Sequence, residues 1–190
     1  MKKLSSILAT TVLVSTFSLS AQAQIKTVIG AGTIEQDCFD VTFYGDMGTQ
    51  KAVNICDEAI SQSTSRNNKA ANHVNRGILL MRGGNLDAAR IDYEKAIKLK
   101  PDLRDAYVNY GALLIHKEDY DGALRALDKA IEGEGTTNLH EALYNRAIVY
   151  HRQNRFREAY LDLKRALELR PEWDDAKRAI GRYSVAKKSG

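Results

Sequence analysis

The sequence predicts an all-α protein built as a stack of antiparallel helix pairs, and two observations lead to this fold class. Nearly the same four residues recur three times, as VNRG at 74–77, VNYG at 108–111 and YNRA at 144–147, at intervals of 34 and 36 residues. The 190 residues include only two prolines, Pro101 and Pro171, and both stand where a repeat would end. A period of this length is typical of a helix–turn–helix unit that buries its apolar face against its neighbours.

The first 23 residues have the composition of an export signal. Two lysines follow Met1, residues 4–19 are largely apolar, and residues 21–23 (AQA) place small side chains where a signal peptidase requires them. An uncleaved anchor is the alternative, but the apolar run is interrupted by Ser and Thr, and a spanning helix takes roughly 20 mostly apolar residues. We therefore expect residues 1–23 to be a signal peptide. The mature chain would begin at Gln24, would be periplasmic or secreted, and would not span the membrane.

The charge balance argues against a nucleic-acid partner. The whole chain carries a net charge of +4, and the predicted signal peptide contains two lysines and no acid, so the mature chain would carry +2. Nucleic-acid binding would need a concentrated basic face, which this balance does not indicate.

Residues 24–69 are expected to form an extended arm (24–32) and a degenerate helical hairpin with its turn near residues 45–49. Cys38 and Cys56, the only two cysteines, stand at equal distances from the middle of that turn. Two antiparallel helices would bring them to the same height, and an exported chain meets an oxidising compartment, so a disulfide is expected. It would contribute about 3 kcal/mol in the chain-entropy description. A redox or metal pair is the alternative, but there is no C-x-x-C motif and no histidine at ligand spacing.

The three repeats are expected to span residues 70–103, 104–139 and 140–173. Each would consist of two helices, with small residues at positions 8, 20 and 27 where the helices approach closely and a larger residue at position 24. In this register the residues at these positions are Gly77, Ala89, Ala96 and Tyr93 in the first unit, Gly111, Ala123, Ala130 and Leu127 in the second, and Ala147, Ala159, Ala166 and Leu163 in the third. Asn85, Asp119 and Asn154 are expected to cap the second helix of each unit.

This pattern resembles the tetratricopeptide repeat over about residues 70–173. The resemblance implies an α-solenoid, a right-handed superhelix of antiparallel helix pairs, in which the first helix of each unit lines a concave surface. Residues 172–190 are expected to form a C-terminal capping helix, because a terminal repeat would otherwise expose an apolar face. In this cap, Gly181 would repeat the small residue of position 8.

The concave face that the resemblance implies carries a recurring set of side chains. Positions 6, 9 and 13 share one face of a helix, position 6 is Asn in every unit, and position 13 is Arg or His. The predicted peptide-binding residues are Asn75, Ile78 and Arg82 in the first unit, Asn109, Ala112 and His116 in the second, and Asn145, Ile148 and Arg152 in the third.

An Asn side chain carries one hydrogen-bond donor group and one acceptor, which match the two polar groups of a peptide unit. The row resembles the asparagine ladder in the repeats of O-linked N-acetylglucosamine transferase. An alternative stays open for each set of residues. Each Asn could instead bond a neighbouring helix, and the basic residues of position 13 could simply follow the general preference of helix C-termini for positive charge. Glu141 and Asn145 stand where chaperone-binding repeats have basic residues, which argues against a dicarboxylate ligand.

The sequence contains no nucleophile elbow, phosphate loop or H-E-x-x-H motif, so we expect a protein that is not an enzyme and needs no cofactor or metal. The favoured function is an adaptor that holds an extended segment of another envelope protein. A carrier or sensor of a small ligand, such as a cell-wall fragment, and a self-associating structural subunit are the alternatives. The oligomeric state is left open by the sequence.

Overall fold

The computed structural model describes residues 33–45, 49–132 and 138–183, and within these ranges the chain is helical and contains no strand. The predicted all-α fold class is therefore confirmed. The predicted signal peptide, the start at Gln24, the arm at 24–32 and the end of the cap after residue 183 lie outside the described residues. The helices are α1 (Ile34–Phe43), α2 (Gln50–Gln62), α3 (Arg66–Arg82), α4 (Leu86–Leu99), α5 (Arg104–His116), α6 (Tyr120–Glu132), α7 (Leu139–Arg152), α8 (Phe156–Leu169) and α9 (Asp174–Ile180), followed by a 3-10 turn, η1 (Gly181–Tyr183).

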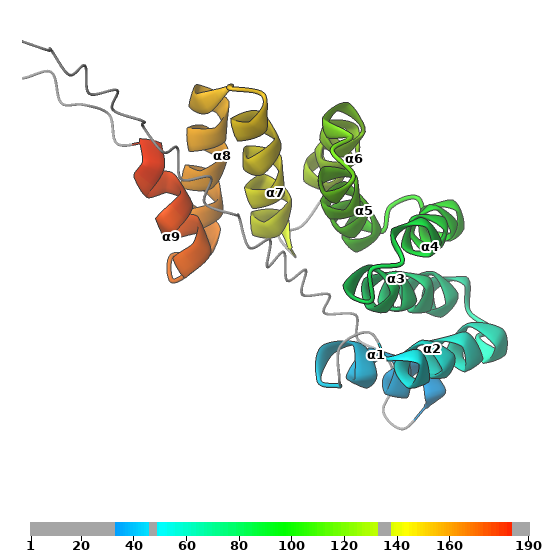
Figure 1. Ribbon diagram of the computed structural model, residues 1–190. Coiled ribbons are helices and arrows are strands. Elements are labelled where there is room, and N and C mark those ends of the chain that lie inside the picture. Colours follow the sequence, from blue (N-terminus) through cyan, green and yellow to red (C-terminus); the bar gives the residue numbers. More distant parts are fainter. Residues whose placement is uncertain (1–32, 46–48, 133–137, 184–190) are drawn as a thin grey trace, which may run out of the picture.

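The helices form consecutive pairs that follow one another along an arc (Figure 1). The pairs are α1–α2, α3–α4, α5–α6 and α7–α8, and α9 packs against α8 at the end of the arc. The first helices of successive pairs, α1, α3, α5 and α7, contact one another along the inner side, and the second helices lie on the outer side. Each pair thus buries its apolar surface against the next pair, as expected for a solenoid.

The first pair contains both cysteines. Thr33 and Thr49 cap α1 and α2 with their hydroxyl groups, and residues 46–48 between these helices lie outside the described residues. The sulfur atoms of Cys38 and Cys56 lie 2.12 Å apart, at disulfide distance, in a small core with Ala52, Val53 and Leu79. Antiparallel pairing about the turn brings the two cysteines together in the way that their symmetric placement suggests.

Close packing between the two helices of a pair depends on the small residues at position 8. A Cβ atom added to Gly77 would lie 2.6 Å from the ring of Tyr93, and one added to Gly111 would lie 2.6 Å from Cγ of Leu127. Real Cβ atoms do not approach other atoms so closely, so in these two pairs the side chain at position 24 leaves no room for a residue larger than Gly at position 8. In the third pair Ala147 and Leu163 share one buried cluster.

The turn inside each of the pairs α3–α4, α5–α6 and α7–α8 has a left-handed residue at the same position. Gly84, Glu118 and Asn154 have φ angles of +81°, +59° and +59°. The next residue then caps the second helix: Asn85 accepts from the amide of Ala88 at 3.2 Å, and Asp119 accepts from the amide of Gly122 at 2.9 Å.

The predicted cap at Asn154 is wrong, because Asn154 occupies the left-handed position, which Asn tolerates better than most residues. Arg155 stands at the cap of α8 and makes no side-chain capping bond.

The helices at the two ends of the repeat region have features that the repeat register does not describe. The helix of the first unit begins at Arg66 rather than near Ala70, because the hydroxyl group of Ser65 caps it. The helix α9 buries Ala176, and the Trp173 that precedes it lies with its ring centroid 4.6 Å from that of Tyr144. The expected packing role of Gly181 is wrong, since α9 ends there and no atom lies within 4 Å of a Cβ built on it.

Candidate functional site on the inner face

The inner face is formed by α3, α5 and α7, and it carries the three asparagines of position 6. Their side chains are strongly buried: Asn75 is 1% exposed, Asn109 4% and Asn145 4%. The apolar residues one turn further along, Ile78, Ala112 and Ile148, are buried as well. The predicted row therefore lies on the three inner helices, and its side chains are buried rather than on a fully open surface.

The hydrogen bonds of these asparagines differ from unit to unit. Asn109 donates its amide to the backbone carbonyl of Asp105 in the same helix, at 2.8 Å. Neither Nδ2 nor Oδ1 of Asn75 has a hydrogen-bond partner in the described part of the chain, although both atoms are buried. Buried polar groups without partners are rare in native proteins, so the unpaired amide of Asn75 calls for a physical explanation.

The three side chains of position 13 do not form one uniform row. The guanidinium group of Arg82 donates to the backbone carbonyl of Thr42. This oxygen is one of the last carbonyls of α1, which lack a partner within their own helix. His116 and Arg152 are exposed at the ends of α5 and α7. Arg82 thus connects α3 to α1, and only the other two lie openly on the surface.

A second recurring arrangement, on the outer side, was not predicted from the sequence. Arg76 donates Nε and Nη2 to the two carboxylate oxygens of Asp92 at 2.7 and 2.6 Å, and Nη1 to Asp57 at 2.5 Å. Arg146 repeats this geometry, with Nε and Nη2 on Asp162 at 2.7 and 2.9 Å and Nη1 on Asp128 at 2.7 Å. Each arginine therefore connects its own helix pair to the second helix of the preceding pair.

Asp92 is the most deeply buried of these carboxylates, and a ring nitrogen of His73 lies 2.9 Å from it. Burial alone would raise the pKa of Asp92, but the hydrogen bonds from Arg76 and His73 and their charges hold it below its ordinary value. The equal spacing of 16 residues between Arg76 and Asp92 and between Arg146 and Asp162 was the signal available in the sequence.

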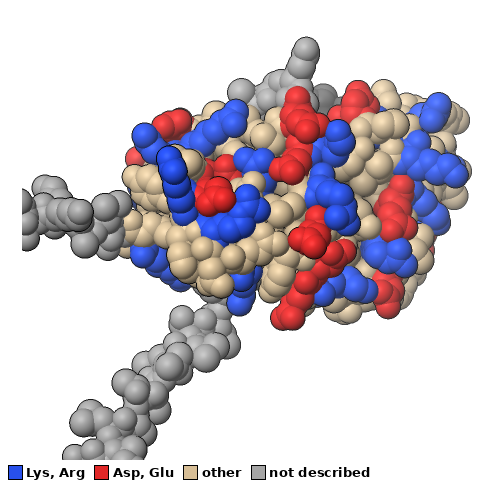
Figure 2. All heavy atoms as spheres, turned by 90° about the horizontal axis from the view of Figure 1, so that it is seen from above, with Lys and Arg blue, Asp and Glu red and all other residues tan. Residues whose placement is uncertain are grey.

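The described ranges show no metal site and no membrane span. They contain no group of three or more His, Cys, Asp or Glu side chains that could hold a metal ion. No helix in these ranges is long and apolar enough to cross a membrane. The face in Figure 2 mixes acidic and basic side chains, without a large area of a single sign.

Comparison with known proteins agrees with this architecture. Two family models of the tetratricopeptide repeat match residues 74–138 and 140–172, which together make up just over half of the chain. The chain belongs to the tetratricopeptide repeat family. Repeats of this family generally act as scaffolds for protein–protein interaction rather than as catalysts.

One curated relative is a protein of Haemophilus influenzae described as a lipoprotein NlpI homolog. It is 35% identical over 82 residues, which are 42% of this chain and 26% of the relative. The chain thus matches only about a quarter of that protein's length.

Solved structures show the same fold. One is described as YrrB, a TPR protein with an unusual peptide-binding site; the TM-score is 0.57 at 25% identity, over 66% of this chain and 62% of that one. A MamA RS-1 double mutant has a TM-score of 0.63 at 18% identity, over 84% of this chain and 88% of that one, which shows likeness of fold alone.

Proposed function

We propose that this protein is a non-catalytic adaptor that binds an extended segment of a partner protein on the inner face formed by α3, α5 and α7. The observation that carries the proposal is the amide of Asn75, which is buried and has neither its donor nor its acceptor paired among the described residues. A peptide backbone supplies the C=O and N–H that such an amide lacks. The unusual peptide-binding site for which YrrB is described gives the same proposal a precedent among similar folds.

The proposed binding requires the segment to reach Asn75 between the inner helices. An unpaired buried polar group costs about 1–3 kcal/mol in the free protein, and the bound segment would relieve that cost. Asn109 already donates one of its two amide N–H groups to the carbonyl of Asp105, so it has fewer free polar groups to offer a ligand than Asn75. Asn75 is therefore the leading contact in the proposal, and Asn109 and Asn145 extend the row.

The test replaces Asn75 by Ala and measures both stability and binding. We expect the melting temperature of the free protein to stay the same or rise, because no hydrogen bond is lost. Binding to the partner, identified by photo-crosslinking from position 78, should weaken between about fivefold and a hundredfold, which corresponds to roughly 1–3 kcal/mol. The triple change that also replaces Asn109 and Asn145 should weaken binding further.

Asn72 provides the matched control on the same helix. Its Nδ2 donates to the hydroxyl of Ser63 at 3.0 Å, so it joins α3 to the residue that follows α2. Asn72→Ala should lower stability and reduce binding only in proportion to the loss of folded protein. If Asn75→Ala behaves like Asn72→Ala, the asparagine row is structural and the proposal fails.

We further infer that the protein works in the cell envelope. Three features support this: the signal-like residues 1–23, the cysteine pair at disulfide distance, and the lipoprotein named among its relatives. The intact mass of protein recovered from the envelope should match a chain that begins at Gln24, and it should rise by two hydrogen masses on reduction. A retained residue 1 would contradict the proposed location.

A further inference from the structure

The outer contact between neighbouring pairs, here called the seam, is built differently in the middle of the solenoid. Arg76 closes the seam between α2 and α4, and Arg146 closes the seam between α6 and α8. In the seam between α4 and α6 the matching positions hold Tyr110 instead of Arg and Ala126 instead of Asp. The Tyr110 hydroxyl donates to Glu94 on α4 at 3.2 Å, but Ala126 offers no polar group on the α6 side.

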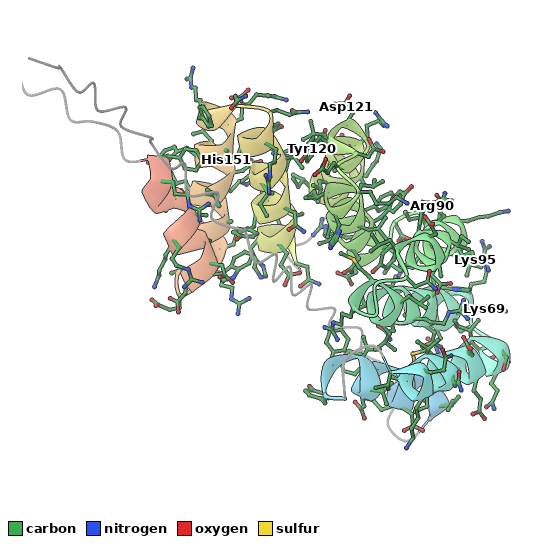
Figure 3. All side chains as sticks on the ribbon, in the orientation of Figure 1. Lys69, Arg90, Lys95, Tyr120, Asp121 and His151 are labelled. Atoms are coloured by element: carbon green, nitrogen blue, oxygen red, sulfur yellow. A yellow bond between two sulfur atoms is a disulfide. The ribbon has the colours of Figure 1, made fainter. Side chains whose placement is uncertain are left out.

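This substitution leaves a groove of about 450 Å³ between α4 and α6, with α5 as its floor. Its apolar surface comes from Ile97, Tyr107, Tyr110, Leu114 and Ala126. Arg90 and Lys95 mark α4 in Figure 3, and Tyr120 and Asp121 mark α6, the two helices that form its walls. The volume lies within the range of roughly 300–1,000 Å³ that is typical of ligand sites.

The rim of the groove carries more basic than acidic side chains, with Lys98, Arg125 and Lys129 against Glu94 and Asp119. Glu94 pairs with Arg90 at 2.8 Å, whereas Asp119 accepts only from a neutral backbone amide at the cap of α6 and keeps its charge. Lys129 on the rim pairs with Glu132. The other two cations, Lys98 on α4 and Arg125 on α6, are exposed on opposite walls and have no ion-pair partner in the described ranges.

We propose that this groove is a second docking site, which takes a protein segment bearing an aromatic or branched aliphatic side chain next to a carboxylate. The apolar side chain would pack on Tyr107, Tyr110 and Leu114, and the carboxylate would lie between Lys98 and Arg125. An anchor side chain in a preformed apolar slot with charged residues at its rim is how many protein interfaces concentrate their binding energy. The site lies on the outer side of the arc, so it is independent of the inner face.

The direct test titrates the full chain with a blocked peptide of sequence Gly-Asp-Phe-Glu-Gly and follows binding by calorimetry. Two matched peptides replace Phe by Ala, or both acids by Lys. We expect each matched peptide to bind at least about tenfold more weakly, because the aromatic side chain and a neighbouring carboxylate carry the recognition. No heat of binding from the Phe peptide up to millimolar concentration would overturn the proposal.

Two sets of variants locate the binding. The double change Tyr110→Arg with Ala126→Asp rebuilds the arginine–aspartate pair of the other seams and fills the groove, so peptide binding should fall at least about tenfold while the helical signal persists. Lys98→Glu with Arg125→Glu alters only exposed side chains, so the fold is preserved, and it should shift preference to the Lys peptide. If neither variant changes the titration, the peptide binds elsewhere and the proposal is wrong.

A third variant and a free ligand separate the remaining possibilities. Asn75→Ala should leave the affinity for the Phe peptide unchanged, which distinguishes this site from the inner face. Phenylpropionate, which carries the ring and a carboxylate without a peptide backbone, should bind more weakly than the peptide. Equal affinity for phenylpropionate would assign the groove to small molecules and overturn the proposed protein partner.

Discussion

At the scale of single residues, the sequence predicts where small side chains are required, but it does not predict which charged side chains form ion pairs. Gly77 and Gly111 stand out because the repeat demands a small residue wherever Tyr93 and Leu127 press against the facing helix. Arg76 and Arg146 looked like ordinary surface charges, since exposed helix faces are rich in such residues. Their partners lie 16 to 19 residues away along the chain, and only the packed helices bring them within hydrogen-bond distance.

The inner-face asparagines show the same limit at the candidate site. The sequence has Asn at position 6 of every unit and predicted that these residues share the inner face. The three residues do lie on the three inner helices. The sequence offered no sign that Asn109 bonds its own helix while Asn75 has no partner among the described residues. That difference depends on how each helix packs against its neighbours, which residue identity alone does not determine.

At this scale we predict how the charge of Asp92 contributes to stability and how that contribution depends on pH. Because its pKa in the folded protein is lowered, its charge stabilises the fold above its ordinary pKa of 3.8, and that contribution disappears as the pH falls through the lower folded value. Asp92→Asn should therefore lower the free energy of unfolding by about 3 kcal/mol at neutral pH, since the arginine and histidine beside it lose their charged partner. Urea unfolding at several pH values should show this difference shrinking below pH 4.

Asp128 is the matched control, because it accepts from Arg146 but its side chain is 46% exposed. Asp128→Asn should cost less than about 1 kcal/mol, as exposed ion pairs generally do. A loss for Asp92→Asn that stays constant between pH 3 and pH 7 would contradict the assigned role of its charge.

At the scale of helices, the order and type of elements followed from the repeat, whereas their ends depended on local chemistry. The repeat register placed α3 to α8 and the turn inside each of the three repeats, because position 8 must face position 24. The helix α3 begins four residues before the expected start of the first unit, and the hydroxyl of Ser65 caps it, which the repeat pattern does not describe. The capping residue of α8 was misjudged by one residue, because the left-handed position precedes it.

The first helix pair shows how an element outside the clear repeats is held in place. Its cysteines lie at disulfide distance, and its packing on α3 is supplemented by the bond from Arg82 to the carbonyl of Thr42. Arg82 therefore belongs to the structure of this joint as well as to the predicted row of position 13. Its role could not be predicted from the sequence, since Thr42 precedes it by 40 residues.

At the scale of the whole molecule, each helix pair contacts mainly the pairs before and after it. Stability in such a chain is approximately a sum of the stability of each unit and of each joint between neighbours. The joint before α7 contains Arg146 on Asp128 and the amide of Asn138 on Asp105 at 2.6 Å. The joint before α3 contains Arg76 on Asp57. Weakening the contact between two neighbouring pairs should therefore lower the local stability of the helices between that contact and the nearer end of the solenoid.

This leads to a prediction with opposite outcomes for two equivalent arginines. Arg146→Gln leaves the largely buried Asp162 without its charged partner and removes the contact to α6, which should lower local stability by roughly 2–3 kcal/mol. Hydrogen exchange measured by mass spectrometry should then show faster exchange in α7, α8 and α9, with little change in α1 and α2. Arg76→Gln should give the reverse pattern, because it loosens the first pair. If both variants speed exchange equally along the whole chain, the helices unfold as one cooperative unit, and the joints do not divide the solenoid in the way proposed.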